Sequence, residues 1–191
     1  LADALAGTGV FLKTNALVRA NGYGFIKEVR SRGLRPFVDA KFFDIENTLK
    51  RDGILLGPYA PDLVTVACVS GVKAMMALRK QLPKATRILG VTILTGLEES
   101  ECVDIFGMSL QTAVRRLATL AVRAGLDGVV VAPKEIGMIR KQFGSALTIN
   151  TPNVRPMWAK VRRDDQNRGR SMTHIDALRA GADTFITERI V

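Results

Sequence analysis

Two carboxylates and one ammonium group lie close together in the sequence, just after a short apolar stretch. Asp39 and Lys41 are two residues apart, so on a β-strand both side chains would leave the same face. Asp44 follows where the strand should have turned into a loop. Flanking acids raise the pKa of a lysine, and a lysine held protonated can donate a proton to an atom that becomes basic during a reaction. A structural ion pair at the end of a strand accounts for the spacing equally well.

The chain around this cluster alternates between strand and helix patterns. Seven apolar runs predict strands at residues 10–14, 36–41, 63–68, 88–94, 128–132, 146–151 and 184–187. Helical patterns cover residues 22–32, 45–57, 71–81, 110–124, 134–143 and 173–180. Most of the strands are continuous apolar runs, as expected of parallel strands that are buried on both faces. The pattern predicts an α/β fold with a parallel sheet, open or closed into a barrel, in a single domain over residues 1–191.

The composition is that of a globular protein. Of the 191 residues 47% are apolar and 24% are charged, which fits one domain with a sizeable core. The net charge of +10 raises the possibility of a nucleic-acid or membrane partner. However, aromatic residues make up only 6%, and the basic residues are spread over several helices apart from a basic stretch at 160–170. A small anionic substrate explains that stretch as well as nucleic acid does, so we expect neither a nucleic-acid nor a membrane partner.

Cysteine and histidine content limits the chemistry further. Cys68 and Cys102 are too few for a disulfide framework and form no CxxC pair, so we expect a reducing, cytoplasmic environment. His174 is the only histidine, which excludes a histidine-rich metal site. No apolar run approaches the ~18 residues that a membrane span needs.

The charged cluster belongs to a longer motif. Asp39, Lys41, Asp44, Ile45 and Thr48 form Asp-x-Lys-x-x-Asp-Ile-x-x-Thr, which resembles the signature of the orotidine 5′-monophosphate decarboxylase family. The resemblance implies a TIM (β/α)8 barrel that decarboxylates orotidine 5′-monophosphate to uridine 5′-monophosphate, a carboxy-lyase with no metal and no organic cofactor. It also implies a homodimer whose active sites are shared across the interface.

The family pattern assigns roles to the charged residues. Asp39 would lie near the leaving carboxylate, and Lys41 would stabilise and protonate the carbanion at C6. Lys13, at the end of the first strand, matches the first lysine of a Lys-Asp-Lys-Asp tetrad and would bind Asp39 and reach the ribose. Asp44 and Thr48 would reach the active site of the neighbouring subunit.

Four further stretches resemble substrate-binding segments of the family: residues 89–98, 150–156, 165–166 and 180–191. They supply the expected substrate-binding residues Thr95, Gly96, Pro152, Gln166, Glu188 and Arg189. Gln166 and Arg189 would bind the phosphate. Gly96 replaces a serine that recognises the pyrimidine, Asn153 replaces a glycine in a turn that asparagine can also adopt, and Glu188 replaces a glycine beside the phosphate.

The resemblance covers nearly the whole chain but not both ends of the barrel. The first strand and the last helix of the family pattern are missing from the sequence, so we expect seven strands. Two alternatives remain: a magnesium-dependent sugar-phosphate decarboxylase or aldolase on the same scaffold, and a non-catalytic phosphate- or nucleic-acid-binding barrel.

Overall fold

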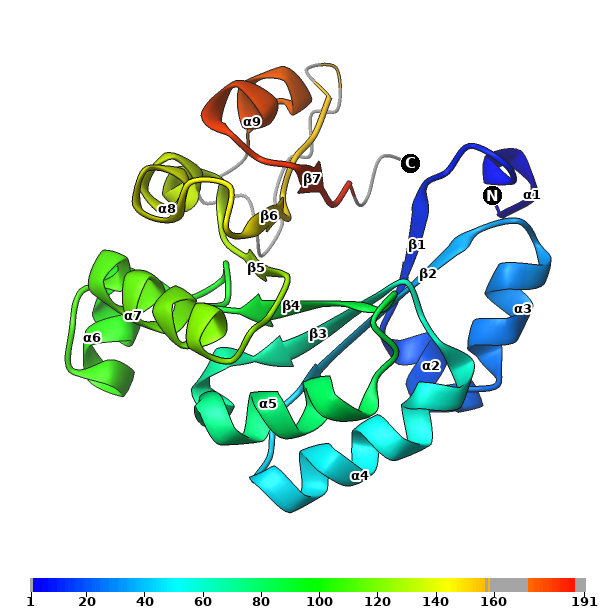
Figure 1. Ribbon diagram of the computed structural model, residues 1–191. Coiled ribbons are helices and arrows are strands. Elements are labelled where there is room, and N and C mark those ends of the chain that lie inside the picture. Colours follow the sequence, from blue (N-terminus) through cyan, green and yellow to red (C-terminus); the bar gives the residue numbers. More distant parts are fainter. Residues whose placement is uncertain (1, 157, 159–171, 188–191) are drawn as a thin grey trace. The chain divides into compact units, whose positions relative to one another are not determined.

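The computed structural model describes residues 2–156, 158 and 172–187, and the statements below concern these residues. The chain divides into two compact units, residues 1–88 and 89–191 (Figure 1). In both units the strands are parallel and follow chain order, and helices connect them. All seven expected strands are present.

The first unit holds three complete strands, β1 (Phe11–Thr14), β2 (Arg35–Phe42) and β3 (Leu63–Ala67). β2 lies between the other two, with Lys13 opposite Phe37 and Val38 opposite Val64. The helical segments of this unit are α1 (Ala2–Leu5), α2 (Ala16–Asn21), α3 (Phe25–Ser31), α4 (Glu46–Leu56), η1 (Gly57–Tyr59), η2 (Cys68–Ser70) and α5 (Gly71–Gln81).

Helices α4 and α5 pack side by side next to β2 and β3 (Figure 1). Apolar side chains repeat at helical spacing on both, and Leu49, Leu56, Met75 and Leu78 are fully buried between the layers. Gly53 in α4 allows the close approach, because a Cβ atom there would lie 2.7 Å from the Cβ of Gln81. This packing fixes α4 and therefore the loop that connects β2 to it.

The second unit contains most of β4 (Arg87–Val91), together with β5 (Gly128–Val130), β6 (Thr148–Thr151) and β7 (Thr184–Phe185). Its helices are α6 (Glu99–Phe106), α7 (Leu110–Arg123), η3 (Pro133–Glu135), α8 (Ile136–Phe143) and α9 (His174–Ala180). Gly128 opens β5 opposite Thr148, and a Cβ atom at Gly128 would lie 2.3 Å from the carbonyl oxygen of Thr148. Only glycine fits where these two strands meet.

The predicted boundaries are wrong in a few places, for local reasons. β4 ends at Val91 rather than 94, since a turn closed by the Leu97 N–H on the Leu94 carbonyl follows it. Cys68 begins a 3₁₀ turn instead of ending a strand. Two short helices, α2 and α6, were not predicted. A reciprocal cap between Glu98 and Glu101 starts α6, and it was the available signal for that helix. No helix in the described ranges is long and apolar enough to cross a membrane.

Candidate active site

Three charged side chains meet at the carboxyl ends of β1 and β2. The Lys41 Nζ lies 2.8 Å from Oδ2 of Asp39, and the Lys13 Nζ lies 3.2 Å from the same oxygen. Asp39 is almost fully buried, whereas the side chains of Lys13 and Lys41 are 24% and 36% exposed. One carboxylate oxygen therefore binds two ammonium groups that remain accessible from solvent.

β2 reaches this arrangement through an irregularity and not as a regular strand. Val38 pairs with Val64 and Phe42 pairs with Val66, so residues 39–41 lie opposite Thr65 alone. Lys41 has a φ of +49°, the left-handed region that residues other than glycine seldom occupy. Strand alternation was therefore the wrong reason for expecting Asp39 and Lys41 on one side, although the two side chains do meet.

Thr65 of β3 lies opposite this irregularity and binds both Asp39 and Lys41. Its hydroxyl donates to Oδ1 of Asp39 at 2.9 Å and accepts the backbone N–H of Lys41 at 2.9 Å. Sequence reasoning did not single out Thr65. The available signal was a lone hydroxyl inside an apolar strand, Leu-Val-Thr-Val-Ala, that follows the charged motif.

These contacts set the charge of the site. Burial by itself would raise the pKa of Asp39, but the hydrogen bond and charge of Lys41, the charge of Lys13 and the Thr65 hydroxyl together hold that pKa below its ordinary value. Asp39 is thus a carboxylate at any pH near neutrality. An ammonium held against a buried carboxylate can stabilise a developing carbanion and then supply a proton to it.

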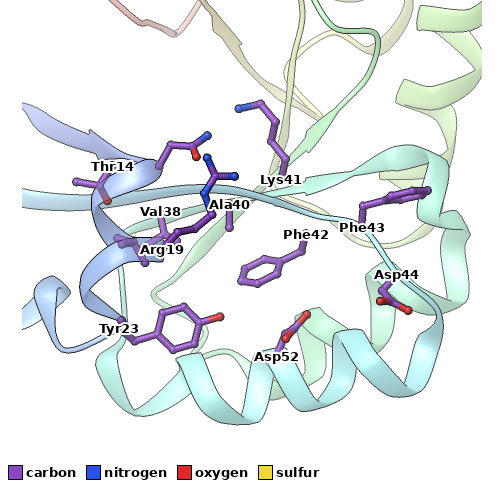
Figure 2. Close-up of a pocket in the computed structure, with 13 residues that line it drawn as sticks. Thr14, Arg19, Tyr23, Val38, Ala40, Lys41, Phe42, Phe43, Asp44 and Asp52 are labelled. Carbon is purple, nitrogen blue, oxygen red and sulfur yellow. The ribbon is translucent and has the colours of Figure 1, made fainter.

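Asp44 and Thr48 follow the cluster, in the loop after β2 and in the first turn of α4. The Oδ1 of Asp44 accepts the backbone N–H of Ile45 at 2.7 Å, and Thr48 lies in the first turn of α4. Asp44 lines a pocket of about 520 Å³ within the first unit, together with Tyr23, Lys41 and Asp52 (Figure 2). The structure therefore places Asp44 and Lys41 on the lining of one pocket.

The pocket also contains a tyrosine and an aspartate, Tyr23 and Asp52, on the side of β2 away from the Lys41 ammonium. Figure 2 shows the Tyr23 and Asp52 side chains turned toward each other below β2, while the Lys41 side chain points away from them. Burial and then the charge of Asp44 raise the pKa of Asp52. Burial and then the charge of Asp52 raise the pKa of Tyr23.

The remaining expected residues belong to the second unit. Thr95 and Gly96 form the turn after β4, and Pro152 follows β6. Asn153 has a φ of +61°, which confirms that asparagine adopts the left-handed turn expected there. Gln166, Glu188 and Arg189 lie outside the described residues. Within the described ranges, no group of three or more His, Cys, Asp or Glu side chains could hold a metal ion.

Charged side chains at the carboxyl ends of parallel strands, with a helix after nearly every strand, define an enzyme of the (β/α) barrel class. Solved structures support that fold. An uncharacterized conserved protein from Geobacillus kaustophilus matches with a TM-score of 0.80 and 26% identity, over 96% of this chain and 81% of that one. Orotidine 5′-phosphate decarboxylase from Lactobacillus acidophilus matches with a TM-score of 0.74 and 23% identity, over 91% and 75%.

Sequence comparison identifies the family. The model of the orotidine 5′-phosphate decarboxylase / HUMPS family matches residues 1–191. Orotidine 5′-phosphate decarboxylase of Vibrio parahaemolyticus is 33% identical over 173 residues, which is 88% of this chain and 72% of the relative. The chain belongs to the orotidine 5′-phosphate decarboxylase / HUMPS family.

Proposed function

We propose that the protein decarboxylates orotidine 5′-monophosphate to uridine 5′-monophosphate, the last step of de novo pyrimidine nucleotide synthesis, without a metal or an organic cofactor. Family membership supports the reaction. The observation that carries it is the shared carboxylate oxygen of Asp39, which holds the ammonium groups of Lys13 and Lys41 at 3.2 and 2.8 Å.

The three residues divide the chemistry between them. The bond between C6 and the carboxylate breaks, its electron pair stays on C6, and carbon dioxide leaves. Lys41 stabilises this carbanion by its charge and then transfers its proton to C6. Asp39 lies beside the leaving carboxylate and holds the Lys41 ammonium by an ion pair, and Lys13 binds Asp39 and reaches the ribose.

Remote contacts would supply the binding energy for this step. Arg189 and Gln166 bind the phosphate in the proposal, Thr95 and Gly96 lie at the base, and Pro152 lines the substrate. Interactions with the non-reacting phosphate can be used to stabilise the transition state. Arginine suits a phosphate because it forms bidentate, charge-assisted hydrogen bonds.

The deciding experiment is turnover of orotidine 5′-monophosphate by the purified protein in the presence of a chelator. We expect equimolar uridine 5′-monophosphate and carbon dioxide, at a rate that the chelator leaves unchanged. A protein that binds uridine 5′-monophosphate but releases no carbon dioxide would overturn the proposed reaction.

The proposal includes a homodimer in which Asp44 and Thr48 act in the partner's site. Asp44 accepts the backbone N–H of Ile45, and Phe43 and Ile45 beside it are 67% and 70% exposed. Large exposed apolar side chains that flank a functional acid favour a protein interface there.

Mixed dimers test this arrangement. A Lys41→Ala subunit paired with an Asp44→Ala subunit contains one site with both native residues, so part of the activity should return on mixing two inactive proteins. Verified heterodimers that remain inactive would contradict shared sites. Mixing Lys41→Ala with Asp39→Ala is the matched control: both residues act in the site of their own subunit, so each change disables one of the two sites and no intact site forms.

Gly96 and Glu188 are the departures from the family pattern that matter most for binding. The backbone φ of Gly96 is outside the left-handed region, and a Cβ atom there would meet no atom within 4 Å. Gly96→Ser should therefore fold normally and tighten uridine 5′-monophosphate binding by restoring a hydroxyl.

Glu188→Gly removes a negative charge beside the proposed phosphate. We expect tenfold tighter binding if the carboxylate faces the phosphate and little change if it faces away, about 1.4 kcal/mol separating the two cases. Loss of binding in Arg189→Ala is the reference.

We place the enzyme in the cytoplasm. Cys68 and Cys102 are both free and buried, and burial raises the pKa of the Cys68 thiol to about 12. Unpaired, protonated thiols in the core suit a reducing compartment.

A further inference from the structure

Thr65 joins the two residues to which the proposed reaction assigns the chemistry. Its side chain lies on β3, and the residue is 1% exposed. A hydroxyl has one proton to donate and lone pairs to accept with. The proton goes to Oδ1 of Asp39, and a lone pair takes the backbone N–H of Lys41.

The Thr65 hydroxyl also binds the backbone of Lys41. Residues 39–41 lie opposite Thr65 alone, and Lys41 has a φ of +49°. A left-handed lysine costs free energy and persists only where its surroundings fix it. The hydrogen bond from Lys41 N–H to the Thr65 hydroxyl is a direct contact that holds this conformation.

The same hydroxyl decides how the Asp39 carboxylate is turned. With Oδ1 bound to Thr65, Oδ2 is left for both ammonium groups. Rotation of the carboxylate would break the Thr65 bond and at least one of the lysine contacts. The orientation of Asp39 and the backbone of Lys41 thus depend on one atom that lies on another strand.

We propose that Thr65 is a positioning residue for the decarboxylation: it fixes the carboxylate plane of Asp39 and the left-handed backbone of Lys41, so that the ammonium group is directed to one point in the site. This inference rests on the proposed roles of Asp39 and Lys41. Thr65 itself touches no reacting atom in the proposal.

Thr65→Val and Thr65→Ser separate the hydroxyl from the shape of the side chain. Valine keeps the branched shape and loses the hydrogen bonds, whereas serine keeps them. For Thr65→Val we expect kcat to fall about ten- to a hundredfold, the loss typical of a hydrogen bond to a charged group, while KM changes less than about threefold. Thr65→Ser should retain most of kcat.

Thr86→Val is the matched control. Thr86 is also 1% exposed, in the same unit, and its hydroxyl is buried without a hydrogen-bond partner among the described residues. The same change there should leave kcat per folded protein unaltered. Equal losses of kcat in Thr65→Val and Thr86→Val, or a serine variant as impaired as the valine variant, would overturn the proposal.

A carbon-13 titration of the Asp39 carboxyl distinguishes this inference from the proposed function. Removing a donor to the ionised carboxylate should raise the pKa of Asp39 in Thr65→Val and move the acid limb of the kcat profile upward in step. An Asp39 pKa that is the same in wild type and Thr65→Val overturns the positioning role, even if the enzyme is active. A wild-type protein without turnover refutes the proposed function, while the titration still reports on Thr65.

Discussion

A buried acid on β2 and a partly buried acid on α4 show opposite shifts of their pKa values. Asp39 lies against two ammonium groups and a hydroxyl, and its pKa is lowered. Asp52, on α4 in the neighbouring pocket, lies near Asp44 and Tyr23, and its pKa is raised. Burial acts in the same direction on both carboxyls, so the difference comes from the partners that the chain places beside each.

The comparison contrasts an ionised carboxylate that has a proposed role in catalysis, Asp39, with a carboxyl whose ionisation lowers the free energy of unfolding, Asp52. The neighbours of Asp39 keep its carboxylate ionised beside two ammonium groups. The pocket holds Asp52 near a second acid and a phenol, and the pKa values of Asp52 and Tyr23 are both raised. Three substitutions test this contrast, in order of decreasing effect.

Lys41→Met should lower kcat by a thousandfold or more, because it removes the proposed proton donor and the positive charge at C6; general acid catalysis and charge stabilisation each contribute about 10²-fold or more. Uridine 5′-monophosphate should still bind. The matched control is Lys50→Met on the exposed face of α4, for which we expect unchanged turnover. Unchanged turnover in Lys41→Met would contradict the proposed catalytic role of the cluster.

Asp39→Asn should lower the free energy of unfolding by about 1–3 kcal/mol at neutral pH, since two partly exposed ammonium groups lose their shared counter-charge. Because the folded-state pKa of Asp39 is lowered, its contribution is complete above the ordinary pKa and is lost as pH falls through the folded value. Urea unfolding of both proteins between neutral and strongly acid pH should therefore show the gap closing on acidification. The control, Asp62→Asn, breaks exposed pairs with Arg30 and Arg35 and should cost less.

Asp52→Asn should raise the free energy of unfolding, by less than ~1 kcal/mol, which is the smallest of the three expected effects. The folded-state pKa of Asp52 is raised, so its ionisation opposes folding above that value and has no effect below the ordinary pKa. The gain should thus grow with rising pH in thermal unfolding curves and vanish in acid. Asp104→Asn, an exposed acid on α6, should show no such trend. A loss of stability at neutral pH would mean that Asp52 has a favourable partner.

The motif and the periodicity predicted much of the fold and the central cluster. Strand order followed from the alternation of apolar runs and helices, and the position of Lys13 two elements before Asp39 placed both at neighbouring strand ends. The left-handed Asn153 was also predictable, because asparagine tolerates that conformation.

The irregular parts were not predictable from local pattern. Spacing assumes regular strands, but the departure of β2 from its register is decided by contacts with Thr65 on another strand. The pairing of Tyr23 with Asp52 joins a loop to a helix 29 residues later, a distance over which periodicity carries no signal. Short helices such as α2 have too few residues to show a helical period.

The backbone of Lys41 also has a practical consequence for engineering. A φ of +49° is unstrained for glycine but strained for most other residues. The Lys41→Gly protein should therefore be more stable than the Lys41→Ala protein by about 1 kcal/mol. Directed evolution that scores thermostability alone would then tolerate glycine best among small replacements, at the position where the proposed proton donor stands. Selection of improved variants of this protein must therefore include turnover in every round.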